Sequence, residues 1–185
     1  MAAVDTVATS PQGPMAVVML KKGTGSGAGQ APGGRSAETV IRHRGGNRQV
    51  ELSDGQRWHL PRGKSATDIP AEDKVGDMLQ EAVTKAAKEW GEHRLSGAER
   101  RAIDEAKKNG EYWLARLLER EARGRFVHAT VEAQFKGRLR FNHQGVDVVD
   151  LSPGGYKYEI LSGTNSNLAR HGRRMASEFF RMLTF

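Results

Sequence analysis

The sequence contains no cysteine and no long apolar segment, and both absences exclude classes of protein. Without cysteine the chain forms no disulfide and performs no thiol chemistry, although this absence is compatible with any compartment. The longest apolar run near the start, residues 15–20, is far too short to cross a bilayer. It also lacks the charged and then apolar layout of a secretory signal peptide, so we expect none in this chain.

Two common motifs of phosphate binding and acyl transfer are also missing. Residues 23–34 are rich in glycine, but no Gly-Lys-Ser/Thr follows them, which argues against a phosphate-binding loop. The sequence has no Gly-x-Ser-x-Gly, so we do not expect an acyl-transfer enzyme built on that motif.

Apolar residues are scarce as well. They make up 37% of the 185 residues, and the mean hydropathy is −0.62. Part of the 22 glycines is concentrated in residues 23–34. Such a segment cannot bury enough apolar surface to offset the entropy of an ordered chain. We therefore predict a flexible Gly-rich linker over residues 1–38.

What the sequence has in excess is positive charge. Lys and Arg number 29 against 22 Asp and Glu, which gives a net charge of +7. A basic surface favours nucleic acid, anionic lipid or an acidic partner. The same balance also fits a soluble surface that is basic without binding any of these.

The rest of the sequence divides into two regions. Over residues 39–69, short apolar segments alternate with turn signals, which predicts a small basic β-meander and a linker. Residues 70–185 predict an α+β domain with a small central mixed sheet flanked by helices. Ser96 and Glu99 fit a capping box at the start of one helix. The expected helices cover residues 71–90, 95–109, 111–135 and 165–183, and the expected strands cover residues 138–141, 146–151 and 156–161.

The acids inside the predicted hairpin of residues 146–161 are the main functional signal. A carboxylate in a strand that otherwise reads as core is unfavourable unless it is paired or binds a metal. Asp147 and Glu159 lie on adjacent strands joined by a tight turn, so we expect them to converge. Two carboxylates at one end of a sheet suit Mg²⁺, which prefers oxygen ligands and keeps several waters. Asp150 lies on the opposite face if the strand is regular.

Other residues would complete a phosphodiesterase site around that metal. Glu132, on the preceding helix, would supply a third oxygen. Lys157 shares a strand face with Glu159, where it would orient a water or neutralise a phosphate. The last predicted helix carries a dense basic cluster for the nucleic-acid backbone: Arg170, His171, Arg173 and Arg174.

The residues Gly145-Val146-Asp147 and Tyr158-Glu159, in the order helix, strand, strand, strand, helix, resemble the PD-(D/E)XK restriction-endonuclease-like fold. The resemblance covers about residues 111–185. The third motif of that family is an acid, any residue and then lysine. Here Leu161 stands at the lysine position, so Lys157 or a cation of the basic helix would have to serve.

The chain also resembles the C-terminal toxin modules of bacterial contact-dependent inhibition and Rhs-type systems, which follow a flexible junction. The two resemblances together imply a metal-dependent antibacterial nuclease toxin that hydrolyses DNA or RNA phosphodiesters. They further imply a nucleic-acid substrate and a cognate immunity protein as partners. Such a toxin acts in the cytoplasm of a target bacterial cell and is delivered by a secretion system.

Three alternatives stay open at the level of the sequence. Asp147 and Glu159 also suit ion pairs across the sheet with Arg138, Arg140 or Lys157. A metal-independent ribonuclease would instead use histidines as general acid and base, with His128, His143 and His171 available. The third alternative is a basic nucleic-acid-binding or assembly module without enzymatic activity, whose binding would weaken steeply with salt.

Overall fold

The computed structural model describes residues 37–42 by their backbone and residues 48–185 with their side chains. The linker predicted over residues 1–38 lies outside the described residues, apart from its last two positions, which begin the first strand.

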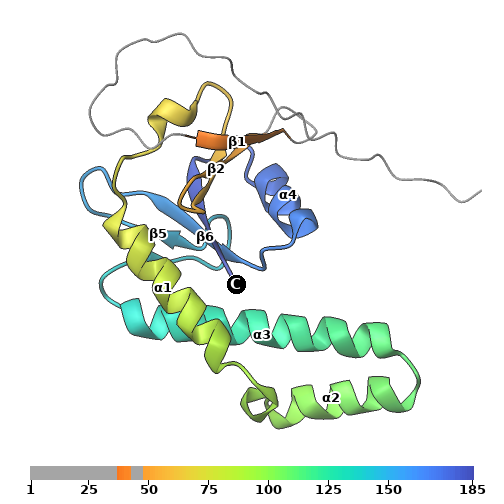
Figure 1. The fold of residues 1–185 in the computed structure, drawn as a ribbon. Coiled ribbons are helices and arrows are strands. Elements are labelled where there is room, and N and C mark those ends of the chain that lie inside the picture. Colours follow the sequence, from red (N-terminus) through yellow and green to blue (C-terminus); the bar gives the residue numbers. More distant parts are fainter. Residues whose placement is uncertain (1–36, 43–47) are drawn as a thin grey trace, which may run out of the picture. The chain divides into compact units, whose positions relative to one another are not determined.

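Seven strands in the described part of the chain form one mixed sheet, in the order β1-β2-β3-β7-β6-β5-β4 (Figure 1). Neighbouring strands are antiparallel except β6 and β7, which run parallel. The strands of the predicted meander join the same sheet as the later strands, because β3 pairs with β7. The strands are β1 (Ala37–Arg42), β2 (Arg48–Leu52), β3 (Arg57–Leu60), β4 (Arg140–Phe141), β5 (Val148–Val149), β6 (Lys157–Leu161) and β7 (Phe180–Thr184).

Four α-helices accompany the sheet within the described residues, so the fold is α+β, as the sequence predicts. They are α1 (Lys74–Glu89), α2 (Gly97–Lys108), α3 (Tyr112–Phe135) and α4 (Asn165–Arg174). The Asp73 carboxylate accepts the Gly76 amide and caps α1, and the capping box of Ser96 and Glu99 is present before α2. None of the described helices is long and apolar enough to cross a membrane.

The helix expected over residues 165–183 is wrong in its second half. Helix α4 ends at Arg174, and the chain then forms strand β7. The apolar residues of this segment recur at helical spacing, but β7 lies between β3 and β6 in the sheet and is buried at its first four positions. A central strand covered on both faces buries more apolar surface than one face of a helix does.

Helices cover both faces of the sheet. Helices α1 and α3 pack on one face, in a buried cluster that includes Leu79, Val83, Val127, Val131, Tyr158 and Ile160. Helix α4 lies on the other face, in a smaller cluster that includes Leu161, Leu168, Met175, Phe180 and Met182. Because side chains alternate along β6, Glu159 shares the α4 face with Leu161.

The first half of α3 packs against α2 instead of against the sheet. A separate apolar cluster joins the two helices: Ile103, Ala106 and Ala115 with Leu95, Leu114 and Leu118. An ion pair between Lys107 and Glu119 (2.9 Å) and one between Glu99 and Arg125 (2.9 Å) cross the same hairpin. Helix α3 is therefore shared between two packing surfaces along its length.

Candidate active site

The ladder between β5 and β6 ends where two carboxylates meet. Continuing its register by one residue places Asp147 opposite Glu159. At this pair, the side-chain carboxylates accept the hydrogen bonds that backbone carbonyl groups accept elsewhere in the ladder. The Asp147 amide donates to Glu159 Oε2 (3.1 Å), and the Ile160 amide donates to Asp147 Oδ2 (2.8 Å). The strands therefore part at this point, and both carboxylates enter the gap.

A histidine reaches this gap from each face of the sheet. From α4, His171 Nδ1 lies 2.5 Å from Glu159 Oε1. From α3, His128 Nε2 lies 3.0 Å from the carbonyl oxygen of Ile160 and 3.9 Å from Asp147 Oδ2. Two helices and two strands thus bring two acids and two histidines to one place.

The hydrogen bonds fix the tautomer of His128. A carbonyl oxygen only accepts, so His128 Nε2 carries the hydrogen, and Nδ1 of the neutral ring is a proton acceptor. In His171 it is Nδ1 that contacts the Glu159 carboxylate, so Nε2 is the other ring nitrogen. Each ring is therefore held to the protein through one of its two nitrogens.

Burial controls the charges of this cluster. The Glu159 side chain is only 4% exposed and that of Asp147 20%. Burial first, and then the charge of Glu159, raise the pKa of Asp147 to about 7, against the opposing effects of the Ile160 amide and of Arg174. Burial also lowers the pKa of His128. The pair of carboxylates therefore retains a proton near neutral pH unless a cation takes its place.

The donor set of Asp147 and Glu159 fits a magnesium ion, which is commonly held by one or two carboxylates and several waters. Their burial and mutual repulsion are relieved by positive charge. No group of three or more histidine, aspartate or glutamate side chains suited to a metal occurs in the described part of the chain. Any metal bound here would therefore depend on these two carboxylates and on water.

Three other acids and bases considered from the sequence lie apart from this contact. Lys157 is on the α4 face of β6, but its ammonium group binds Glu178 Oε2 (2.5 Å). Glu132 follows His128 by one turn of α3, and its charge acts on that histidine. Asp150 accepts the Ser152 amide and hydroxyl and so fixes the turn after β5.

Helix α4 places the predicted basic cluster beside the carboxylates. Arg170, Arg173 and Arg174 are exposed, whereas the ring of His171 turns inward to Glu159. An open groove of about 490 Å³ lies along α3 on the other side of the cluster. It is lined by Glu121, Gly124, Arg125, His128, Ala129 and Glu132.

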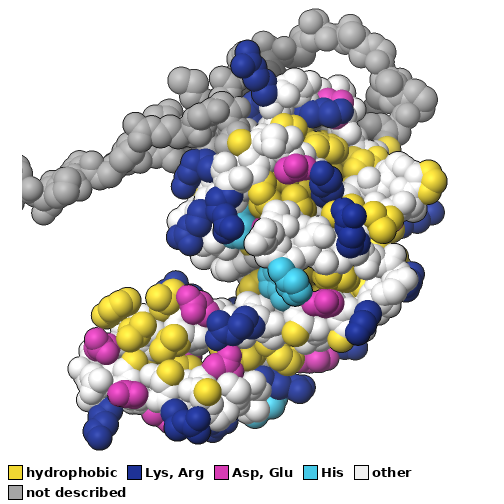
Figure 2. Space-filling view, turned by 180° about the vertical axis from the view of Figure 1, so that it is seen from behind, with side chains coloured by type: hydrophobic (Ala, Val, Ile, Leu, Met, Phe, Trp, Pro, Cys, Tyr) yellow, Lys and Arg dark blue, Asp and Glu magenta, His cyan; other side chains and the backbone are white. Residues whose placement is uncertain are grey.

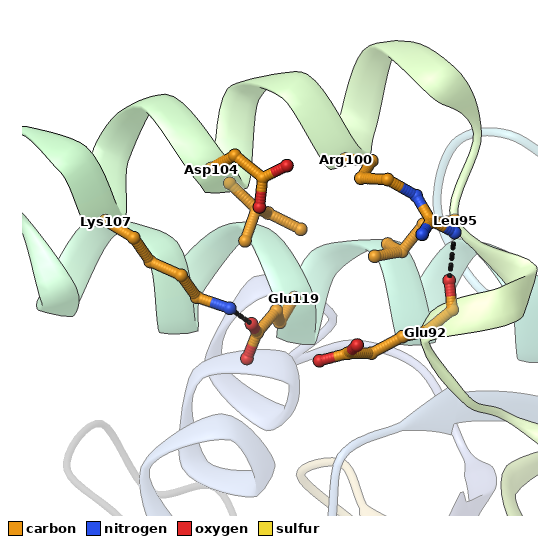
Figure 3. A pocket seen from close by; sticks show the side chains of 7 residues that line it. Glu92, Leu95, Arg100, Asp104, Lys107 and Glu119 are labelled. Carbon is orange, nitrogen blue, oxygen red and sulfur yellow. Dashed lines mark hydrogen bonds and ion pairs between the residues drawn. The ribbon is translucent and has the colours of Figure 1, made fainter.

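A second, smaller pocket of about 110 Å³ lies along the α2–α3 hairpin (Figure 3). Its polar groups bind one another: Lys107 pairs with Glu119, and Arg100 donates to the carbonyl oxygen of Glu92 (3.0 Å). Because its contacts join α2 to α3 and to the segment before α2, we assign this pocket to the packing of the hairpin.

No pattern in the sequence predicts the residues that hold α4 in place. Gln49 of β2 donates to the Leu168 carbonyl (2.8 Å), and His59 of β3 bonds the Glu178 carbonyl (2.7 Å). Each contact joins residues 119 positions apart. Only the central place of β7 brings the meander next to α4, and β7 was the strand that the sequence pattern missed.

Comparison with known proteins gives no relative: no family model, curated protein or solved structure matches the chain.

Proposed function

We propose that this protein is a nuclease that hydrolyses phosphodiester bonds with a divalent metal ion held by Asp147 and Glu159. The observation that carries the proposal is the meeting of these two carboxylates at the end of the β5–β6 ladder. When bound, the metal would activate a water and stabilise the charge that grows on the phosphate.

The chain's own groups suit the remaining tasks. The arginines of α4 are exposed and would bind phosphate oxygens of the nucleic-acid backbone. His128 replaces the missing lysine better than Lys157 does, because Lys157 is bound to Glu178. With Nε2 donating to the Ile160 carbonyl, His128 Nδ1 accepts a hydrogen bond from water. Glu132 lies close enough to act on the charge of that ring.

The order of elements also supports the proposal. Helix α3, strands β4, β5 and β6, and helix α4 follow one another, with Asp147 directly before the second strand and Glu159 on the third. This is the order that the resemblance to PD-(D/E)XK nucleases implies, so we propose a restriction-endonuclease-like core. The toxin role, the bacterial target cell and the cognate immunity protein rest on the sequence resemblance alone.

The test is cleavage of plasmid DNA and total RNA, with Mg²⁺ and with EDTA. We expect cleavage that requires metal, and we expect Asp147→Asn and Glu159→Gln to lose more than the roughly 10- to 100-fold typical of outer-shell partners. Asp150→Asn is the matched control, because this acid belongs to the turn. Cleavage that survives both EDTA and Asp147→Asn would contradict the proposal.

A metal-independent ribonuclease is the second candidate, favoured by the two histidines that flank the carboxylates. Each has one nitrogen anchored and the other available for proton transfer. This candidate predicts RNA cleavage that is untouched by EDTA and lost in His128→Ala or His171→Ala. His143→Ala is the control, because His143 is exposed in the loop before Asp147. If neither DNA nor RNA is cleaved under any condition, the remaining alternative is the basic nucleic-acid-binding module without enzymatic activity.

A further inference from the structure

Helix α3 extends beyond the sheet, so the side of the helix that packs on the sheet in its second half has no sheet against it in its first half. Its residues recur at intervals of three and four, as one side of a helix requires: Trp113, Leu117, Arg120, Gly124, Val127 and Val131. Val127 and Val131 are 0% exposed, whereas Leu117 is 38% and Trp113 is 67% exposed. The first half of α3 therefore presents apolar side chains to solvent on the side that its second half uses for the core.

Helix α2 does not cover this side. It packs on α3 through Leu114, Ala115 and Leu118, which point elsewhere around the helix. Tyr112, at the start of α3, is also 63% exposed. Three of the five exposed large apolar residues in the described part of the chain thus lie within residues 112–117. A cluster of this kind indicates a binding surface, whereas single exposed apolar residues do not.

Exposed cations beside this surface suit an anionic, aromatic ligand. Arg116 and Arg120 are exposed on the same turns of α3. Figure 2 shows a notch in this face, with Lys and Arg side chains over the α4 side, apolar side chains on the wall formed by the α2–α3 hairpin, and histidine at its inner end. Cations opposite exposed aromatic rings are the arrangement that single-stranded nucleic acid requires.

The notch leads from the aromatic residues to the candidate site. Trp113 and His128 are on the same helix, and at 1.5 Å per residue they lie about 22 Å apart along its axis. The groove along α3 ends at His128 and Glu132. A strand whose base stacks on Trp113 can therefore extend along α3 and present a phosphate to Asp147 and Glu159.

We propose that this notch binds a single-stranded segment of nucleic acid, with Trp113 as a stacking platform and the arginines of α3 and α4 on its phosphates. The bases of a duplex are stacked on each other, so only an unpaired segment offers a free base to the indole ring. The inference rests on the proposed nuclease function, because it names the form of substrate that reaches the same site.

The experiment measures binding by the full chain carrying Asp147→Asn, so that cleavage does not interfere. The probes are fluorescein-labelled oligouridine and oligothymidine 12-mers and a 12-base-pair duplex. We expect the single strands to bind at least about tenfold more tightly than the duplex. We expect Trp113→Ala to weaken single-strand binding by about 5- to 100-fold, and Trp113→Phe to restore most of it.

A fluorescence readout and a control variant separate stacking from a change in folding. Stacking quenches the fluorescence of Trp113, and we expect this quenching to disappear in Trp113→Phe while Trp58 and Trp90 still emit. Trp58 is fully buried and Trp90 packs on Phe126, so neither should respond to the probe. Leu151→Ala is the matched control, because Leu151 is 65% exposed and lies in the turn after β5.

The outcomes distinguish this inference from the proposed function. Trp113-dependent binding of single strands without cleavage by the unmodified chain would support the binding surface and overturn the nuclease. Cleavage whose KM for single strands is unchanged in Trp113→Ala would overturn the binding surface and keep the nuclease. Equal binding of duplex and single strand, with no tryptophan quenching, would also overturn the inference.

Discussion

Asp147 is held in a position that opposes its ionisation. Its side chain is only 20% exposed. The neighbouring Glu159 carboxylate accepts a hydrogen bond from the backbone amide of Asp147. These effects together raise the pKa of Asp147 to about 7. A group of this kind lowers the stability of the fold wherever the unfolded chain is ionised and the folded chain is not. Proteins tolerate such groups most often at functional sites.

The first prediction is that Asp147→Asn stabilises the protein at high pH. Between about pH 4 and pH 7 the folded chain holds a proton on Asp147 that the unfolded chain has lost, so the free energy of unfolding falls as the pH rises through this window. Asparagine still accepts the Ile160 amide and has no proton to lose. We expect a gain of roughly 1–3 kcal/mol at pH 8 and almost none at pH 4.

Urea unfolding in EDTA at pH 4, 6 and 8 measures this difference. Asp104→Asn serves as the control, because Asp104 is an exposed acid of α2 outside the cluster. A gain that is the same at all three pH values would show that the carboxyl group of Asp147 ionises as easily in the folded chain as in the unfolded one.

At the scale of single elements, α4 depends on its seat against the meander. Gln49 and His59 bond the carbonyl groups of Leu168 and Glu178, which lie in and just after the helix. Gly172 lies between these contacts. A Cβ atom there would be 2.9 Å from Gln49 Nε2 and 3.1 Å from His59 Cδ2. The close approach of helix and sheet therefore requires glycine at this position.

The second prediction is that Gly172→Ala displaces α4 and withdraws His171 from Glu159. We expect a loss of about 1–3 kcal/mol in unfolding free energy, as overpacking in a well-packed site usually causes. We also expect cleavage to fall by roughly 10- to 100-fold, because catalytic groups tolerate little misplacement. Urea unfolding and the nuclease assay measure the two effects on the same preparation.

Gly97→Ala is the matched control for that substitution. Gly97 is also a helical glycine, at the first position of α2, but a Cβ atom there would meet only the end of Arg101 at 3.5 Å. Helix propensity favours alanine over glycine, so this variant should be as stable as the unmodified chain or more stable. If Gly172→Ala behaved in the same way, the close seat of α4 would not govern the position of His171.

Local sequence signals predicted helices and strands correctly only where interactions between near neighbours in the sequence determine the structure. The capping box of Ser96 and Glu99 and the apolar period marked α2 correctly, because both act within one or two turns. The prediction for the segment after Arg174 was wrong, because its apolar residues suit a helix face and a buried strand equally. Pairing with β3 and β6 decided between them, and those partners lie far away in the sequence.

At the scale of the whole molecule, the same limit applies to the site. The hairpin turn allowed the sequence to place Asp147 near Glu159, because only twelve residues separate them. The approach of His171 to the same carboxylate was not predicted, although it is equally near in sequence. It depends on α4 crossing the sheet toward β7, and therefore on the strand order.

A buried ion pair connects α1 to the centre of this sheet. Arg181 of β7 donates to Asp73 Oδ2 (3.0 Å) and to Asp77 Oδ1 (2.8 Å), and Tyr158 of β6 donates its hydroxyl to Asp73 Oδ1 (2.8 Å). Burial and the charge of Asp73 raise the pKa of Tyr158, so its hydroxyl remains a donor. Asp73 thus caps one helix and bonds two central strands, through side chains on the face of the sheet opposite to that of Glu159.

The last prediction is that Asp73→Asn destabilises the whole fold without impairing the chemistry. Asparagine still accepts the cap and tyrosine hydrogen bonds but leaves Arg181, whose side chain is 4% exposed, with Asp77 as its remaining ion pair. We expect a loss of about 2–4 kcal/mol, because an incompletely paired buried charge is unfavourable. Asp68→Asn, which removes an acid from an exposed cap, should cause a much smaller loss.

Because the ion pair and the carboxylate cluster share no residue, cleavage by the folded fraction of Asp73→Asn should match that of the unmodified chain. If Asp73→Asn instead lost cleavage while keeping its full stability, Asp73 would belong to the proposed active site, and the purely structural role assigned to its ion pair would be wrong.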